Sequence, residues 1–436
     1  MMKLSPDAIT SLLTSLFPSG MIDDLARERE VVVRNRKLDV RILVWTLVVG
    51  FAVGGEARSI AGYRRTYNGA TGQNLVASSF YDRFTKQLER LLGDLLDHAV
   101  EEVAVPHTIA PAFEHFRDVV VADATVVRLH RFLSAFPATH QGVSGIKLYL
   151  VHSVTAQSVI ARAITDERTH ESTLFKTGSW MCGRLFLLDL GFFKYHRFAL
   201  IEENDGFFVS KLKRSANPEI VRELREWPGG AIPLEGKRVF DVLGELCREH
   251  IDVEVEVRFQ RRVYNEKRSW DSKLFRVVGV RDKDADDGYR LYITNLPSET
   301  FSPEDISTLY RARWVVELLF RELKSKYGLG RFSTEKEHIV RIQVTSALLT
   351  LVVSRAILRL FIDHAEELGD ECTFPTERWA TTFRSFAQQV LSEIAVSFDY
   401  VPDVPNTWYQ EARQPAPSRQ TLLEEVNAAL YAGFTA

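Results

Sequence analysis

The stretch from residue 302 to residue 327, SPEDISTLYRARWVVELLFRELKSKY, constrains the fold of this chain more than any other stretch. Ser302, followed by Pro303 and Asp305, predicts a helix start. The serine can cap the first turn, the proline suits the first helical position, and the aspartate can bond back to the serine amide. Gly328 suits the end of a helix. We therefore predict one uninterrupted helix over this stretch.

Four polar side chains share one narrow stripe of the predicted helix. At about 100° per residue, they project at roughly 0°, −60°, −20° and −40° for Tyr310, Arg313, Glu317 and Lys324. Apolar residues beside the stripe would supply the buried contacts. One carboxylate flanked by a phenol, a guanidinium and an ammonium could hold a metal ion against a phosphate group. The alternative is surface ion pairing between residues spaced by four, such as Arg313 and Glu317.

Composition places the chain among globular proteins with a large core. Its 436 residues suggest two or three domains, and 45% of them are hydrophobic and 26% charged. The net charge of −3 does not by itself indicate a nucleic-acid partner, but a local basic stripe is enough to bind phosphates. Residues 258–276 hold seven Lys/Arg against two acids. A solvated surface explains such a run equally well.

Other features exclude several classes of protein. The three cysteines are far apart and form no C-x-x-C pair, which argues against disulfides or a cysteine zinc site and fits a reducing cytosol. The first ten residues do not resemble a signal peptide. The apolar run at 42–53 is too short to span a bilayer, and arginines interrupt the run at 348–362. We predict buried core helices for both runs and no membrane partner.

Residues 1–105 are predicted to be helical throughout. A short arginine-rich helix, a Gly-Asn-rich turn and a second helix from Ser79 are compatible with helix-turn-helix DNA binding. Arg58, Arg64 and Arg65 would then contact DNA. An ordinary helical bundle with a polar rim is the alternative interpretation.

The hydrophobic pattern changes after a proline-bearing linker predicted at 105–111. Residues 112–212 combine strands with helices, which indicates a mixed α/β sheet. Residues 213–297 are predicted to be mostly β, as an insertion ahead of the capped helix. Residues 298–345 would complete the α/β core, and residues 346–436 are predicted to be helical.

Two aspartates, Asp123 and Asp189, directly follow apolar runs that are predicted to be strands. Either one alone would usually face solvent at a strand end. Carboxylates at the ends of neighbouring strands can converge, however, and Glu317 from a helix packed on the sheet could join them. Such hard oxygen ligands select Mg²⁺ or Mn²⁺, and three acids without a cation would repel one another. The sequence therefore predicts a metal site.

The spacing Tyr-(2)-Arg-(3)-Glu-(6)-Lys at residues 310–324 resembles the Tyr-Arg-Glu-Lys signature of the DDE transposases of bacterial and archaeal insertion sequences. Asp123 in VVADAT resembles the first catalytic aspartate of that family, and Asp189 in LLDLGFF resembles the second. The order of Asp, Asp, β-rich insertion and Glu also matches. The resemblance covers roughly residues 115–345.

The resemblance implies a ribonuclease H-like mixed sheet with a β-rich insertion, flanked by helical N- and C-terminal regions. It implies cut-and-paste DNA transposition, in which metal-activated water cleaves the element ends and the freed 3′-OH attacks target DNA. Asp123, Asp189 and Glu317 would hold Mg²⁺ or Mn²⁺, with two ions per active site.

The resemblance also implies which residues contact DNA. Arg313 and Lys324 would bind phosphates, and Tyr310 would add a hydroxyl. An aromatic residue of the insertion would stack on a base flipped out of the duplex, and the candidates are Trp270 and Tyr289. Ordinary packing is the alternative for either aromatic residue.

A transposase must bring two DNA ends together. Residues 1–105 would therefore bind the element ends, and residues 346–436 would supply dimer or synaptic contacts, in a homodimer at the nucleoid of a prokaryotic cytoplasm. Two alternatives stay open: a nuclease of this fold that cuts without joining, and a non-catalytic DNA-binding protein derived from a transposase. The intact set of acids argues against the second alternative.

Overall fold

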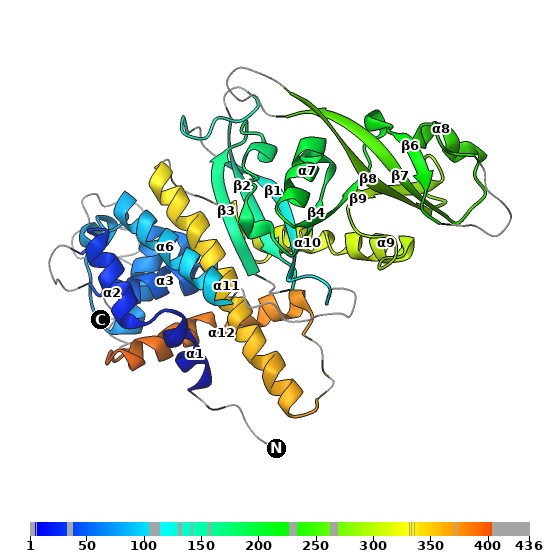
Figure 1. Cartoon of the computed structure of the whole chain (residues 1–436). Coiled ribbons are helices and arrows are strands. Elements are labelled where there is room, and N and C mark those ends of the chain that lie inside the picture. The colour runs from blue at the N-terminus through cyan, green and yellow to red at the C-terminus, as the bar shows by residue number, and fades with distance from the viewer. Residues whose placement is uncertain are drawn as a thin grey trace, which may run out of the picture.

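A large mixed β-sheet lies beside a layer of helices in the computed structural model of the chain (Figure 1). The predicted linker at 105–111 and the predicted C-terminal region beyond residue 402 lie outside the residues that the structure describes. These described residues are 5, 7–32, 38–103, 114–129, 133–140, 143–155, 158–225, 233–261, 269–330, 332, 334, 336–370, 372 and 374–402.

The sheet has nine strands in the order β3-β2-β1-β4-β5-β9-β8-β7-β6. β1 pairs antiparallel with β2 and parallel with β4, β4 pairs parallel with β5, and the other neighbours are antiparallel. The first five strands form the mixed sheet predicted for residues 112–212. The strands are β1 (Asp118–Leu129), β2 (Ser144–Ser153), β3 (Ser158–Asp166), β4 (Arg184–Leu188), β5 (Phe207–Lys211), β6 (Glu219–Glu223), β7 (His250–Gln260), β8 (Trp270–Arg281) and β9 (Tyr289–Thr294).

The β-rich stretch predicted at 213–297 continues this sheet, because β9 pairs with β5. Alternation of apolar and polar residues along β7 fits a strand with one buried face. β4 is apolar from Leu185 to Leu188, and these residues are buried on both faces. Short connecting helices are η1 (Gly55–Arg58), η3 (Glu171–Thr173), η4 (Ser179–Met181), η5 (Leu190–Phe192), η6 (Arg214–Ala216), α8 (Val239–Val242) and η7 (Leu243–Glu245).

Two hydrophobic cores cover the two faces of the sheet. Val119 and Val121 of β1 belong to the core shared with the helical layer. Val120 and Ala122 belong to the other core, beneath α7 (Tyr195–Glu203). Side chains of a strand alternate between faces, so every odd-numbered residue of this part of β1 faces the helical layer. Asp123, an odd-numbered residue of β1, therefore faces the helical layer.

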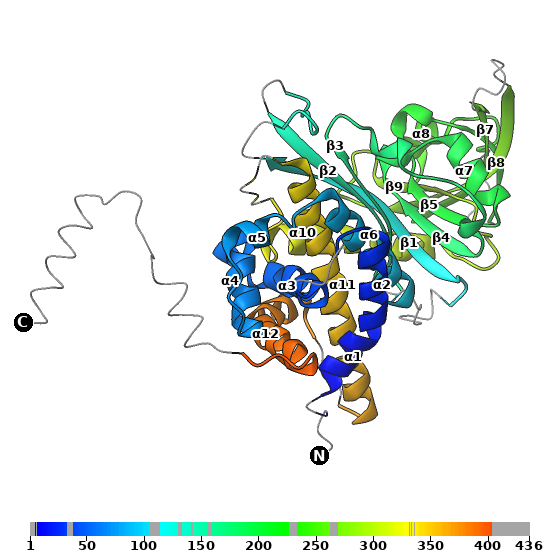
Figure 2. The same ribbon diagram turned by 90° about the vertical axis from the view of Figure 1, so that its left-hand side faces the viewer.

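The helices that precede and follow the sheet form one layer (Figure 2). α3 is buried along almost its whole length, so it needs cover on all sides, and α11 and α12 provide it together with neighbouring N-terminal helices. The predicted boundary between residues 345 and 346 falls inside α11. The layer comprises α1 (Ala8–Leu16), α2 (Ser19–Glu28), α3 (Val40–Val53), α4 (Ile60–Thr71), α5 (Ala77–Tyr81), α6 (Lys86–Val103), α11 (Glu337–Glu367) and α12 (Thr376–Ser397).

Both apolar runs are core helices, as predicted. The run at 42–53 lies in α3 and the run at 348–362 in α11. By length and composition alone, α11 could cross a membrane, but 72% of its apolar window is buried inside the protein. In Figure 1, α11 (yellow) runs along the boundary between the helical layer and the sheet.

The predicted helix over 302–327 is two helices, α9 (Pro303–Arg311) and α10 (Trp314–Ser325). The predicted capping box is confirmed: the Asp305 amide donates to the Ser302 hydroxyl at 3.1 Å, and the Ser302 amide donates to the Asp305 carboxylate at 2.8 Å. α9 packs on β8, whereas α10 packs on β1. Ala312 and Arg313 separate the two helices, and the regular helical hydrogen bonding is interrupted there.

Candidate functional site

The two predicted aspartates lie next to each other on neighbouring parallel strands. The last paired residues of β1 and β4 are Ala122 and Leu188, and Asp123 and Asp189 follow them directly. Both aspartates are odd-numbered positions on the face that packs against the helical layer. Asp123 is not at a strand end as predicted, because β1 continues beside β2 to Leu129 after β4 has ended.

α10 brings Glu317 to the same place. One open pocket of about 650 Å³ is lined by side chains from β1, the end of β4, and α10. Asp123, Asp189 and Glu317 all line it, together with two of the predicted phosphate-binding residues. The full lining is Asp123, Ala124, Thr125, Asp189, Arg313, Glu317, Phe320, Arg321, Lys324 and Ser325.

Arg313 lies between two of the three acids. Its Nη2 donates to Glu317 Oε1 at 2.5 Å, and its Nη1 is 4.0 Å from Asp123 Oδ2. The Arg313 side chain is only 9% exposed, and its Nε is buried without a hydrogen-bond partner among the described residues. Burial lowers the pKa of Arg313, but the hydrogen bond to Glu317 and the charges nearby outweigh it and raise the pKa overall.

The environment of Asp123 disfavours the charged form of its side chain. Burial, together with the nearby Glu171 and Asp189 carboxylates, raises its pKa to about 6, while the Ala124 amide and Arg313 act in the opposite direction. Asp123 lies near other carboxylates, and its own partners stabilise its negative charge only weakly. A bound cation would stabilise that charge. The all-oxygen donor set also fits Mg²⁺ or Mn²⁺.

The acids do not yet form a closed ligand set. Across the residues that the structure describes, no three His, Cys, Asp or Glu side chains lie close enough together to hold a metal ion as they stand. Glu317 instead accepts a hydrogen bond from the Arg313 guanidinium. The residues fit a divalent cation in chemistry, and Glu317 would have to leave Arg313 to bind it.

Replacing Asp123 by asparagine is expected to stabilise the metal-free protein at neutral pH. An unfolded aspartate titrates near pH ~3.9, whereas folded Asp123 titrates at about 6. Between these values the folded state holds a proton that the unfolded state has lost, so stability falls as pH rises through this window. In EDTA, Asp123→Asn should raise the free energy of unfolding by roughly 2 kcal/mol at pH 7.5 and change it little at pH 3.5. Urea denaturation at the two pH values measures this, and an equal change at both would contradict it.

Two further stripe residues make backbone contacts. The Tyr310 hydroxyl donates to the Leu188 carbonyl at 3.3 Å, and its ring is buried 5.1 Å from that of Tyr292. Tyr310 is not among the residues that line the pocket. Lys324 lines the pocket and donates to the Val126 carbonyl at 3.0 Å.

Three predicted DNA contacts are held by the protein itself. The Tyr289 ring is 6% exposed, and its hydroxyl donates to the Arg248 carbonyl. Arg58 is buried and donates to the carbonyls of Phe51 at 3.0 Å and Gly328 at 3.1 Å. These two predictions are therefore corrected, since neither side chain is available to DNA as it lies. Arg64 is partly buried and donates to the Leu75 carbonyl at 2.9 Å.

The predicted helix-turn-helix also differs from the structure. The second helix, predicted from Ser79, is divided into the short α5 and the longer α6, and α6 packs against α11 and β3. Arg65 on α4 is exposed. Trp270, at the start of β8, is 70% exposed.

Sequence reasoning missed a fourth carboxylate at this site, that of Glu171. Its charge raises the pKa of Asp123. A Cβ atom added to Gly191, two residues beyond Asp189, would lie 2.3 Å from Glu171 Oε1. The two segments are far apart in sequence, so only the fold brings them together, and no motif marks Glu171.

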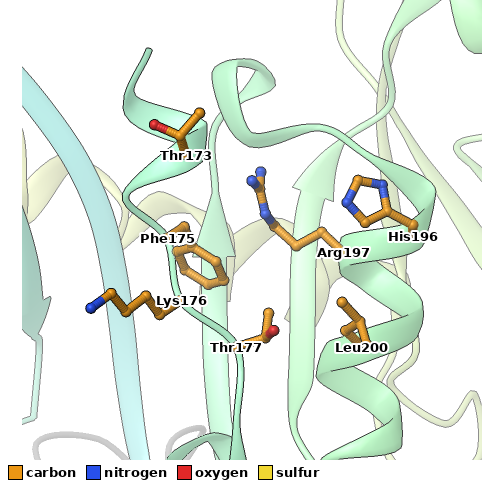
Figure 3. Close-up of a pocket in the computed structure, with 7 residues that line it drawn as sticks. All are labelled: Thr173, Phe175, Lys176, Thr177, His196, Arg197 and Leu200. Atoms are coloured by element: carbon orange, nitrogen blue, oxygen red, sulfur yellow. The ribbon is translucent and has the colours of Figure 1, made fainter. Parts of the chain in front are cut away.

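Arg197 of α7 holds the Glu171 segment in place. It is buried and donates to the carbonyls of Ser172 in η3 and Phe192 in η5, both at 2.5 Å. Figure 3 shows its side chain extending from α7 toward the segment that carries Thr173. A small pocket of about 280 Å³ surrounds it, lined by Thr173, Phe175, Lys176, Thr177, His196, Arg197 and Leu200.

Known proteins share this domain. The family described as "Transposase DDE domain" matches residues 114–353, more than half of the chain. Protein y4zB of Sinorhizobium fredii is 25% identical over 242 residues, which are 55% of this chain and 60% of that protein. The transposase for insertion sequence element IS231F of Bacillus thuringiensis subsp. israelensis is 20% identical over 369 residues, covering 76% of this chain and 75% of that one.

A solved structure has the same fold. The piggyBac transposase, in a synaptic complex with hairpin DNA, aligns with a TM-score of 0.51 at 10% identity. The alignment covers 94% of this chain and 87% of that one. The matched domain spans both aspartates, Glu317 and the strands that place them. This chain belongs to the DDE transposases of insertion sequences.

Proposed function

We propose that this protein cleaves DNA at the ends of an insertion sequence and joins the freed 3′-OH ends to target DNA, by metal-dependent phosphoryl transfer. One observation carries the proposal: Asp123, Asp189 and Glu317, from three separate elements, line a single open pocket beside Arg313 and Lys324. A pocket lined by both acids and cations suits a scissile phosphate and the metal ions that activate it.

Each part of the pocket has its own role in this proposal. Asp123, Asp189 and Glu317 hold two Mg²⁺ or Mn²⁺ ions, which when bound activate the attacking oxygen and stabilise the leaving oxygen. Arg313 and Lys324 bind phosphate oxygens, Arg313 in bidentate fashion and Lys324 as a point charge. Tyr310 positions this end of the helix pair, because its hydroxyl is bonded to the backbone carbonyl just before Asp189.

The surrounding regions would bind DNA and a second subunit. Residues 1–105 bind the terminal inverted repeats, with Arg65 on the exposed side of α4 as one contact and Arg64 as a secondary candidate. The predicted C-terminal region, residues 346–436, supplies contacts in a homodimeric synaptic complex. α11 and α12 pack with the N-terminal helices, so end binding and dimer contacts would share one helical layer. The protein would act on DNA in a prokaryotic cytoplasm, at the nucleoid.

Trp270 is expected to stack on a DNA base. It is the most exposed aromatic side chain that the described residues contain, at 70%, and it lies beside the basic Arg258 and Arg261 strand end. Trp270→Ala should weaken binding of a nicked or flipped-base duplex by about 1–3 kcal/mol. Fluorescence anisotropy measures the affinity, and Tyr289→Phe is the matched control, expected to leave it unchanged. Equal affinity of Trp270→Ala and wild type would contradict the stacking role.

A reaction with defined DNA tests the proposed function. The purified full chain is incubated with a duplex carrying the inverted repeats that flank its own gene, a target plasmid, and Mg²⁺ or EDTA. Mg²⁺-dependent cleavage followed by joining is the expected result. Cleavage without joining would instead identify a nuclease of this fold, and binding without cleavage a non-catalytic DNA-binding protein.

A further inference from the structure

The cation that the three acids share in this structure is a side chain. Arg313 Nη2 is bonded to Glu317 Oε1 at 2.5 Å while Nη1 is 4.0 Å from Asp123 Oδ2. The guanidinium therefore contacts the acid of the helix and lies near an acid of the sheet, where its charge offsets theirs.

We propose that Arg313 is an internal counter-cation of the metal-free site, that it competes with the metal for Glu317, and that its release couples metal binding to DNA binding. This inference rests on the proposed function and adds a second role for Arg313 to the phosphate contact. It makes Arg313 a positioning residue for Glu317 before it becomes a DNA contact.

The competition follows from the shared ligand atom. A hard divalent cation binds carboxylate oxygens at about 2.0–2.1 Å and demands a nearly fixed geometry. Glu317 Oε1 already accepts a charge-assisted hydrogen bond from Arg313. A cation on that oxygen would place two like charges in contact inside a pocket where Arg313 is 9% exposed. Arg313 must therefore withdraw when the metal binds.

The surroundings of Arg313 allow its side chain to change position. Arg313 lies at the junction of α9 and α10, where the regular helical hydrogen bonding is interrupted. Its Nε has no partner in the part of the chain described, so nothing at that atom resists rotation of the side chain. Its guanidinium carbon is 5.3 Å from the ring of Trp314, which is 58% exposed.

Release of Arg313 makes the two ligands cooperate. Without metal, Glu317 and a DNA phosphate compete for the Arg313 guanidinium. With metal, the pair is already broken. Because coupling between two ligands is reciprocal, DNA must strengthen metal binding by the same factor as metal strengthens DNA binding. Couplings in proteins are typically about 5–150-fold.

Mn²⁺ and a labelled duplex are the probes that test the inference, at constant ionic strength. Mn²⁺ affinity is measured by electron paramagnetic resonance of the free ion, and duplex affinity by fluorescence anisotropy, with wild type, Arg313→Gln and Lys324→Gln. Wild type should bind DNA at least about fivefold more tightly with Mn²⁺. Arg313→Gln should bind Mn²⁺ more tightly than wild type in the absence of DNA and should lose the coupling.

Lys324→Gln is the matched control. It removes a second pocket cation that is bonded to the Val126 carbonyl and not to an acid. It should weaken DNA binding and keep the coupling. Arg313→Lys keeps the positive charge but not the two-pronged guanidinium group. Its Mn²⁺ affinity should therefore lie between those of wild type and Arg313→Gln. It replaces Arg313→Gln if that variant does not fold.

Two results would overturn the inference alone: unchanged or weaker Mn²⁺ binding in the folded Arg313 variants, or a coupling that persists without Arg313. A different result, a wild-type protein that binds no Mn²⁺ with or without DNA, would overturn the proposed function as well.

Discussion

Glu317→Gln is expected to lower the rate of DNA cleavage by roughly a thousandfold, because a metal ligand supplies several kcal/mol of transition-state stabilisation and each ~1.4 kcal/mol is a factor of ten. The carboxamide keeps the shape of the side chain and an oxygen that can still accept the 2.5 Å bond from Arg313. It loses the negative charge that a divalent cation requires. The change therefore removes metal binding with little change to the fold or to the DNA binding measured in EDTA.

Single-turnover cleavage of an end-labelled duplex in Mg²⁺ measures the rate, and anisotropy measures the retained binding. Glu304→Gln is the matched control on the adjoining helix α9, where the Glu304 side chain is 59% exposed and 3.0 Å from His250. It should cleave at the wild-type rate. A Glu317→Gln rate within tenfold of wild type would show that Glu317 is not a metal ligand.

Asp252→Ala is expected to reduce the free energy of unfolding by about 3–5 kcal/mol, the usual cost of leaving a buried charge without its partner. Asp252 is 1% exposed and accepts hydrogen bonds from Arg276 Nε and Nη2, both at 2.7 Å, and from Arg225 Nε at 2.6 Å. The two arginines also donate to the Phe301 carbonyl, which directly precedes the cap of α9. This network ties the inserted strands to the helices that carry Glu317.

Urea denaturation of the two proteins measures the loss. Glu254→Ala is the control on the same strand, since Glu254 pairs with Arg222, whose side chain is 60% exposed. Exposed pairs are worth under ~1 kcal/mol, so this variant should unfold almost as wild type does. If both variants lost the same stability, the buried network would not be what anchors the insertion.

The acids of the site could be predicted from the sequence because their signals are local. Asp123 and Asp189 each follow an apolar run, and residues next to each other on parallel strands share a face once the register is known. The capping box at Ser302 depends on contacts within one turn and is confirmed. The gathering of Arg313, Glu317 and Lys324 around one pocket also followed from spacing.

Other features needed contacts that no local pattern contains. Tyr289 and Arg58 are residue types that often contact DNA. Partners distant in sequence, such as Gly328 for Arg58, bind their side chains inside the protein. Glu171 carries no motif and reaches the site only because Arg197 joins two segments. The division of the helices into N- and C-terminal regions also differs from the structure, because α3 is covered by helices from both.

The sequence by itself indicated the family, the two sheet aspartates, the glutamate of α10 and the start of α9. These depend on hydrophobic period, on capping within a turn and on spacing along a few residues, all of which are properties of short segments. Only the tertiary structure decided that the capped stretch is divided into two helices before Trp314 and that Arg313 pairs with Glu317. The twist of the sheet under the helix and the burial of charges depend on surfaces assembled from the whole chain, and no single segment specifies them.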